Sequence, residues 1–300
     1  MEGFICLILS CLGWSGLDIC RKKLATQLNP FVFVAYLCLG QTICFGIWSF
    51  FDWHTPTAAY YLPSLISVIL NCLTSVMFIH SLRLSGLSNT VPLLSLTPAV
   101  ASLAAIPLLH EYPKPFEMIG MGLIVVGAFG LNLKTDLSEF WNNIWHDRGV
   151  RLMLWVALLF PLSAICDKLA LQQANPAVHS FISSLGIMVV LVLAALFLHK
   201  AKVVDFIVKP ELRLLVLVGA ITASIGFGFQ TLGFQVMHIG LFESFKRAIC
   251  LIITLMSGYW VFKEEINFFK AGSVALMMGG VITMKADLIN PILNHSALPH

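Results

Sequence analysis

Residues 240–262 read GLFESFKRAICLIITLMSGYWVF, an apolar stretch long enough to cross a bilayer that contains Glu243, Lys246 and Arg247. At spacings i, i+3 and i+4, the three charged side chains share one face of a helix. Charged residues inside membrane helices are costly, and they face a partner helix or a water-filled cavity. The stretch therefore predicts a spanning helix whose charges either neutralise one another or line a polar cavity, and we favour the cavity.

The composition of the whole chain points the same way. Of its 300 residues, 58% are hydrophobic and 11% are charged, whereas soluble domains carry about 25% charged residues. The net charge is +3 and the basic residues form no run, so we expect no nucleic-acid partner. The eight cysteines show no CxxC spacing, and we expect neither a metal nor another cofactor. The fold class is that of an all-α, multi-pass protein of a plasma or inner membrane.

Ten apolar segments are long enough to be spanning helices, separated by breakers such as Asn29-Pro30 and Asn175-Pro176. They are Gly3–Leu24, Phe31–Phe51, Tyr60–His80, Leu87–Leu109, Phe116–Leu133, Arg151–Leu171, Ala177–Leu198, Leu212–Val236, Gly240–Phe262 and Phe268–Lys285. The connection over 134–150 has aromatic residues at helical spacing, which favours a short helix in the membrane interface. Residues 288–300 are expected to form a mobile tail.

An internal repeat divides the chain into two five-helix units, residues 1–133 and 151–287. Cys20-Arg21-Lys22 followed by Gln27-Leu28-Asn29-Pro30 recurs as Cys166-Asp167-Lys168 followed by Gln173-Ala174-Asn175-Pro176. Leu109-His110-Glu111, followed by two glycines, parallels Phe262-Lys263-Glu264. Because each unit has an odd number of crossings, the two units have opposite orientations, an arrangement typical of secondary transporters.

The same motifs resemble the EamA-type repeat of the drug/metabolite transporter superfamily. The resemblance rests on the Pro98 helix that ends at Glu111 before Gly120 and Gly127, and on the run from Lys246-Arg247 to Glu264. It implies ten helices around a central substrate cavity with alternating access, and both termini in the cytoplasm. The lysines at the end that holds the termini, Lys114, Lys168 and Lys285, are few compared with the opposite end. By the positive-inside rule the termini would be outside, so the orientation stays open.

Candidate substrate residues combine charged, aromatic and amide side chains, as a pocket for a small polar molecule requires. They are Lys246, Arg247, Glu243, Asn71, Trp14, Tyr36, Phe78, Gln230 and Tyr259. Lys246 or Arg247 could hold a carboxylate or a phosphate, and Glu243 could take up a proton. Alternatively, Glu243 only pairs with the two cations, and the amides and hydroxyls join helices together.

A second group of charges lies near the ends of the first and sixth predicted helices, at repeat-related positions: Asp18, Lys22, Asp167 and Lys168. Inverted-repeat transporters build sites where such helices are broken, so these residues are candidates for coupling. The alternative is that they close helix ends at the water boundary. Glycines at 120, 122, 127, 130, 272, 279 and 280 favour close helix packing within a monomer or, alternatively, a homodimer face.

These observations predict a secondary active transporter of a small polar or zwitterionic metabolite, such as an amino acid, an amine or a nucleoside-linked metabolite. We expect alternating access by rocking of the two halves, driven by protons or by metabolite exchange, including antiport. No Walker A sequence, HExxH or nucleophile elbow is present, so an enzyme is not expected. A membrane receptor or an integral membrane enzyme remain the alternatives.

Overall fold

The computed structural model describes residues 2–24, 27–85, 91–132, 146–197, 208–262 and 268–289. Within these ranges the secondary structure is helical throughout, with η marking a 3-10 helix. The elements are α1 (Glu2–Leu24), α2 (Pro30–Phe51), η1 (Ala58–Tyr60), α3 (Tyr61–Leu84), η2 (Val91–Leu96), α5 (Thr97–Leu109), α6 (Pro115–Asn132), α8 (Arg148–Leu171), α9 (Pro176–Phe197), α10 (Pro210–Val236), α11 (Ile239–Phe262) and α12 (Phe268–Ile289).

The Asn-Pro pairs start helices, as the sequence predicts. The Asn29 side chain accepts a hydrogen bond from the backbone N–H of Phe31 (3.0 Å), and Pro30 begins α2. Asn175 accepts from the N–H of Val178 (3.0 Å) in the same way, and Pro176 begins α9. A side-chain acceptor and a proline in the first turn both satisfy the demands of a helix N-terminus.

The predicted helix Leu87–Leu109 differs from the structure. Val91–Leu96 form the 3-10 helix η2, and the α-helix begins only at Thr97, with Pro98 in its first turn. Proline lacks a backbone N–H and its ring clashes with the preceding turn of an α-helix, so Pro98 favours a helix start at this position. The predicted interfacial helix falls mostly on residues 133–145, which lie outside the described ranges, and α12 continues to Ile289.

Six of the described helical segments are long and apolar enough to cross a membrane: those of α1, α2, η1–α3, α8, α9 and α10. Shorter apolar helices cover Leu93–Leu109, Pro115–Ala128 and Gly272–Met284. The outward faces carry exposed large apolar side chains, such as Ile47, Leu65 and Leu217. Membrane crossing by α5, α6, α11 and α12 stays a prediction.

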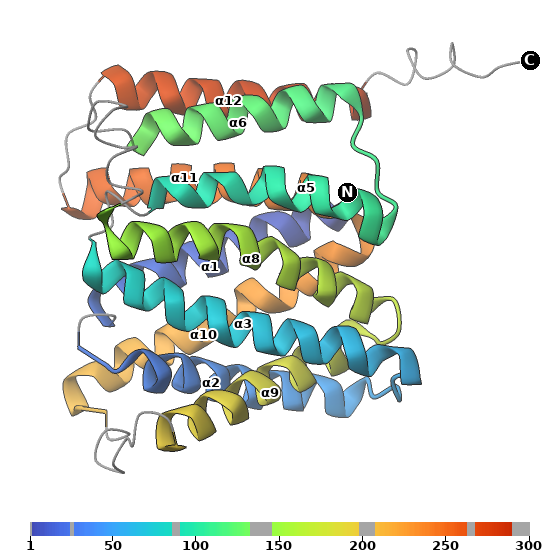
Figure 1. Ribbon diagram of the computed structural model, residues 1–300, viewed down its shortest axis with the longest axis vertical. Helices are drawn as coiled ribbons and strands as arrows, with labels where there is room; N and C mark the ends of the chain where they lie inside the picture. Colours follow the sequence, from blue (N-terminus) through green and yellow to red (C-terminus); the bar gives the residue numbers. More distant parts are fainter. Residues whose placement is uncertain are drawn as a thin grey trace, which may run out of the picture.

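Three of the five pairs of repeat-related helices lie side by side. In Figure 1, α6 and α12 form the upper edge, α5 and α11 lie next to them, and α2 and α9 form the lower edge. Gly120 of α6 faces Met284 of α12, whereas Gly127 faces Met277, so the two helices run antiparallel. Two units of opposite orientation would place their equivalent helices in this way.

The remaining helices pair across the two sequence halves, α1 along α10 and α3 along α8. The α1–α10 contact is close because both helices present glycine: a Cβ atom at Gly13 would lie 2.6 Å from the Gly226 Cα. Gly120, Gly127 and Gly280 make a similarly close contact between α6 and α12. Gly122, Gly272 and Gly279 have no neighbour within 4 Å, so these three do not pack within the described part of the chain.

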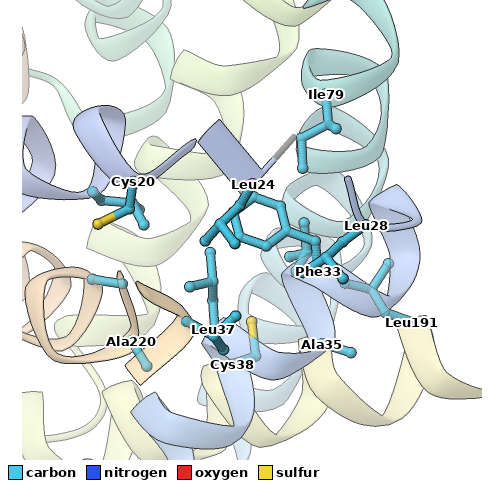
Figure 2. Close-up of a cluster of buried hydrophobic side chains, with 14 of the residues drawn as sticks. Cys20, Leu24, Leu28, Phe33, Ala35, Leu37, Cys38, Ile79, Leu191 and Ala220 are labelled. Atoms are coloured by element: carbon cyan, nitrogen blue, oxygen red, sulfur yellow. The ribbon is translucent and has the colours of Figure 1, made fainter. Parts of the chain in front are cut away.

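Two hydrophobic clusters hold the helices together. The first joins α1, α2, α3, α9 and α10, and Figure 2 shows part of it, including Leu24, Phe33 and Ile79. The second joins α1, α5, α6, α8, α10, α11 and α12. Trp14 packs against both clusters, which places it between them.

Candidate functional site

A cavity of about 100 Å³ lies where α1, α2, α3, α8 and α11 meet. Its walls come from the C-terminal parts of α1 and α3 and from the N-terminal part of α8, so it lies toward one end of the molecule. The lining residues are Trp14, Asp18, Arg21, Val34, Thr74, Ser75, Phe78, Ile79, Leu94, Val156, Phe160, Lys246, Arg247 and Cys250.

Three cations line this cavity, and two of them are paired with carboxylates. Arg21 donates from Nη1 to Asp18 Oδ1 at 3.1 Å, one helical turn back on α1. Lys246 forms an ion pair with Glu243, which is buried one turn back on α11. The two alternatives for helix 240–262 were that its charges neutralise one another or that they line a polar cavity. Both hold in part, because Glu243 neutralises Lys246 while Lys246 and Arg247 line the cavity.

Arg247 is the third cation, and its surroundings differ. Its Nη2 donates to the Thr97 hydroxyl at 3.3 Å, and its buried Nε has no hydrogen-bond partner in the described part of the chain. No described carboxylate lies within 4 Å of the guanidinium. Among the described residues, Arg247 therefore leaves one positive charge uncompensated at the cavity wall.

Aromatic and amide groups support the cations. The Trp14 indole N–H donates to Gln230 Oε1 at 2.9 Å, and the Lys246 ammonium donates to the same oxygen at 3.1 Å. The Arg21 guanidinium lies 5.3 Å from the Phe78 ring centroid and 5.8 Å from that of Trp14, within cation–π range. The cavity thus has aromatic walls and positively charged hydrogen-bond donors.

An ion-pair cluster lies near the start of α1, where Gly3 faces Met237. Lys168 of α8 bonds Glu111, just after α5, at 2.5 Å, and it also donates to the backbone oxygen of Met237 at 2.6 Å. The other carboxylate oxygen of Glu111 accepts the N–H of Ile239 at 2.8 Å. Four segments are thus tied together: the end of α5, α8, the end of α10 and the start of α11.

A second buried polar cluster lies between α3, α8 and α9. His179 Nε2 lies 3.3 Å from Asp167 Oδ1, and Tyr60 Oη lies 3.3 Å from His179 Nδ1. The Ser67 hydroxyl donates to the same Asp167 carboxylate and accepts from the Asn71 amide at 3.0 Å. We name these five residues the Asp167 cluster. Among the described residues, no group of three or more His, Cys, Asp or Glu side chains is placed to hold a metal.

The predicted substrate residues fall into several environments. Lys246, Arg247, Trp14 and Phe78 line the cavity. Glu243 and Gln230 lie behind the wall, each bonded to Lys246. Three residues are elsewhere: Asn71 belongs to the Asp167 cluster, Tyr36 packs against the first hydrophobic cluster, and the Tyr259 side chain is outside the described part.

The predicted coupling residues also separate. Asp18 lies in the cavity wall, Asp167 is buried in its own cluster, and Lys168 is bonded to Glu111. The side chain of Lys22 is outside the described part of the chain.

Sequence reasoning missed Phe160, Cys250 and His179. Phe160 could have been found from the repeat, because it follows Trp14 by 146 residues, the offset that separates Cys166 from Cys20. His179 offered no comparable signal. It is a single histidine in an apolar segment, and only the folded chain places it beside Asp167.

Comparison with known proteins gives a family match over the first part of the chain and a shared fold over nearly all of it. Residues 1–133 match the sequence model of the EamA-like transporter family. No curated protein matches the chain. Among 28 chains of solved structures that match is a crystal structure of a protein with 15% sequence identity and a TM-score of 0.74. It covers 95% of this chain and 98% of its own, and at this identity it shows the fold alone. The family match and the apolar helices make this an integral, multi-pass membrane protein.

Proposed function

From the match of residues 1–133 to the model of the EamA-like transporter family, we propose that the chain is a secondary transporter for a small metabolite that carries a carboxylate or phosphate group. The cavity binds the solute, and alternating access carries it across the membrane. The observation that carries the proposal is the uncompensated guanidinium of Arg247 in the cavity wall.

The charge of the cavity selects the solute class. Arg21 is paired with Asp18 and Lys246 with Glu243, so Arg247 leaves the lining with one excess positive charge. Burying an unpaired charge is costly, and a bound anion would offset that cost. A guanidinium offers a planar fork that fits a carboxylate or a phosphate with two parallel hydrogen bonds. Amino acids and nucleoside-linked metabolites satisfy this requirement, whereas a simple amine does not.

The size of the cavity limits what fits in this conformation. A volume of about 100 Å³ holds about three water molecules at their liquid volume. Pockets for drug-sized ligands have about 300–1,000 Å³. A compact solute therefore fits, or the anionic group of a larger one whose remainder projects through the mouth. The aromatic rings of Trp14, Phe78 and Phe160 supply the apolar contact such a solute needs.

The experiment is counterflow in proteoliposomes. Purified protein is screened by thermal shift with amino acids, phosphorylated and nucleotide-linked metabolites, and amines, and each stabilising compound is tested for exchange of its radiolabelled form. Anionic or zwitterionic compounds should exchange and amines should not. Exchange of amines alone would contradict the proposal.

Variants of Arg247 test the residue that carries the proposal. A hydrogen bond to a charged group contributes about 1.5–3 kcal/mol, so Arg247→Ala should weaken half-saturation by about 10- to 100-fold. Arg247→Lys keeps the charge but loses the fork, and should fall between Arg247→Ala and the unmodified protein. Arg148→Gln removes an exposed arginine outside the cavity and serves as the matched control. Equal half-saturation in Arg247→Ala and Arg148→Gln would remove Arg247 from the site.

A further inference from the structure

We infer that the Asp167 cluster is a proton-binding site that couples solute transport to a proton gradient. The inference rests on the proposed function, which leaves the source of energy open. Its core is the pair formed by Asp167 of α8 and His179 of α9, both almost completely inaccessible to solvent at 2% and 0% exposure.

The geometry of the pair suits one added proton. His179 Nε2 and Asp167 Oδ1 are 3.3 Å apart, yet Nε2 has no aligned hydrogen-bond partner in the described part of the chain. Neutral His179 carries one ring N–H, and its Nδ1 faces Tyr60 Oη at 3.3 Å. A proton taken from water bonds to the lone pair of the unprotonated ring nitrogen and gives imidazolium, in which both nitrogens are donors, one facing Tyr60 Oη and the other 3.3 Å from Asp167 Oδ1. The same N–H bond breaks when the proton leaves.

The charge balance also favours proton uptake. Asp18, Glu111 and Glu243 are each paired with a lysine or arginine. Asp167, in contrast, has no described lysine or arginine within 4 Å. With neutral His179 the pair carries a buried charge of −1, and one proton makes it neutral.

Other titratable groups near Asp167 do not replace the proton. Tyr60 of η1 contacts His179, and Cys166 precedes Asp167 on α8 itself. From α3 the contact is the neutral hydroxyl of Ser67. Lys168 follows Asp167 on α8 but is paired with Glu111, just after α5, and Glu243 of α11 is paired with Lys246.

The Asp167 cluster is connected to the cavity wall. Asn71 bonds Ser67 at 3.0 Å, and the Ser163 hydroxyl contacts Asn71 Oδ1 at 3.4 Å and the backbone oxygen of Phe160 at 2.8 Å. Phe160 lines the cavity. Hydrogen-bonded polar groups with two arrangements can transmit a local charge change between neighbouring sites. Protonation at Asp167 can therefore alter the packing of α3 against α8 at the solute site.

The repeat strengthens this assignment. Asp167 follows Arg21 by 146 residues, so the same position carries a cation at the solute cavity in one half and an acid in the other. The repeat thus places Arg21 in the wall of the solute cavity and Asp167 in the proton site at equivalent positions of the two halves. Binding of one monoanionic solute in the cavity and of one proton at the Asp167 cluster would make uptake electroneutral.

The experiment separates accumulation from exchange. Proteoliposomes receive a proton gradient of about one pH unit, which can drive about tenfold accumulation at one proton per monoanion, with the membrane potential clamped. The unmodified protein should accumulate the solute identified by counterflow. Asp167→Asn and His179→Gln should lose accumulation but retain counterflow, whereas Asp52→Asn, an exposed acid at the same end, should retain both.

Each outcome is decisive. If the unmodified protein exchanges solute but does not accumulate it, the proton inference fails and the proposed function stands. If no compound exchanges, the proposed function itself fails. Undiminished accumulation by both Asp167→Asn and His179→Gln overturns the site. Should Asp167→Asn not fold, as judged by gel filtration, His179→Gln decides alone, and a pH-sensitive dye inside the vesicles measures whether its proton influx is lost.

Discussion

Replacing Glu243 by glutamine should destabilise the protein, because it leaves the buried ammonium of Lys246 without its carboxylate. Removing one partner of a buried ion pair costs about 3–5 kcal/mol. Lys246 would keep its bond to Gln230 at 3.1 Å and its place 5.9 Å from the ring centroids of Phe160 and Phe242. These contacts, and the water of the cavity, place the expected cost at the low end, about 3 kcal/mol.

The assay is thermal unfolding in detergent, followed by tryptophan fluorescence and gel filtration. For large domains each kcal/mol lowers Tm by about 2–4 °C, so Glu243→Gln should lower Tm by about 6 °C or more. The double variant Glu243→Gln/Lys246→Met removes both charges and should return close to the original Tm, since replacing a buried pair by apolar groups is often neutral.

Two results would refute this reasoning. An unchanged Tm in Glu243→Gln would mean that water in the cavity solvates Lys246 and that the pair does not neutralise a buried charge. A double variant as unstable as the single one would mean that Glu243 contributes through packing or hydrogen bonding and not through charge.

Two further predictions concern the packing. Gly13→Ala should lower Tm, because its Cβ would lie 2.6 Å from the Gly226 Cα and overpacking costs about 1–3 kcal/mol. The control variant Gly122→Ala should not lower Tm, because its Cβ would meet no atom within 4 Å. Equal Tm values for the two variants would contradict the close α1–α10 contact. Glu111→Gln should weaken the contacts by which Lys168 of α8 holds Glu111 and the backbone of Met237. In a Ser102→Cys background, the buried cysteine should then react faster with a water-soluble maleimide when Glu111 is replaced than when it is kept. An unchanged reaction rate would show that the Glu111–Lys168 bond does not hold this end closed.

Much of the helical architecture could be predicted because length, hydropathy and breakers are local properties. The start of α2 at Pro30 and of α9 at Pro176 follows from capping chemistry alone. The late start of α5 also had a local signal in Pro98, which a reading of apolar length alone overlooked. What length could not settle is which of the shorter apolar helices cross the membrane.

The site was only partly predictable, because the contacts of a helix face depend on which neighbouring helices pack against it. The i, i+3, i+4 spacing put Glu243, Lys246 and Arg247 together, but it could not show that Glu243 turns to Lys246 while Arg247 keeps no carboxylate. Tyr36 and Asn71 resemble pocket residues in sequence, yet one packs in a hydrophobic cluster and the other joins the Asp167 cluster. Those outcomes depend on how α2 and α3 are rotated, which no local pattern specifies.

The pairing of α1 with α10 and of α3 with α8 decides how this chain can be divided. A cut between residues 133 and 146 would separate each of these helices from the helix that buries it. Each fragment alone would therefore expose a packing surface, with Gly13 on one fragment and Gly226 on the other. The two fragments could fold only on each other, as an obligate pair. Under the proposed transport function, any rigid bodies that move relative to one another would therefore each contain helices from both halves of the sequence, and their boundary would not lie at its midpoint.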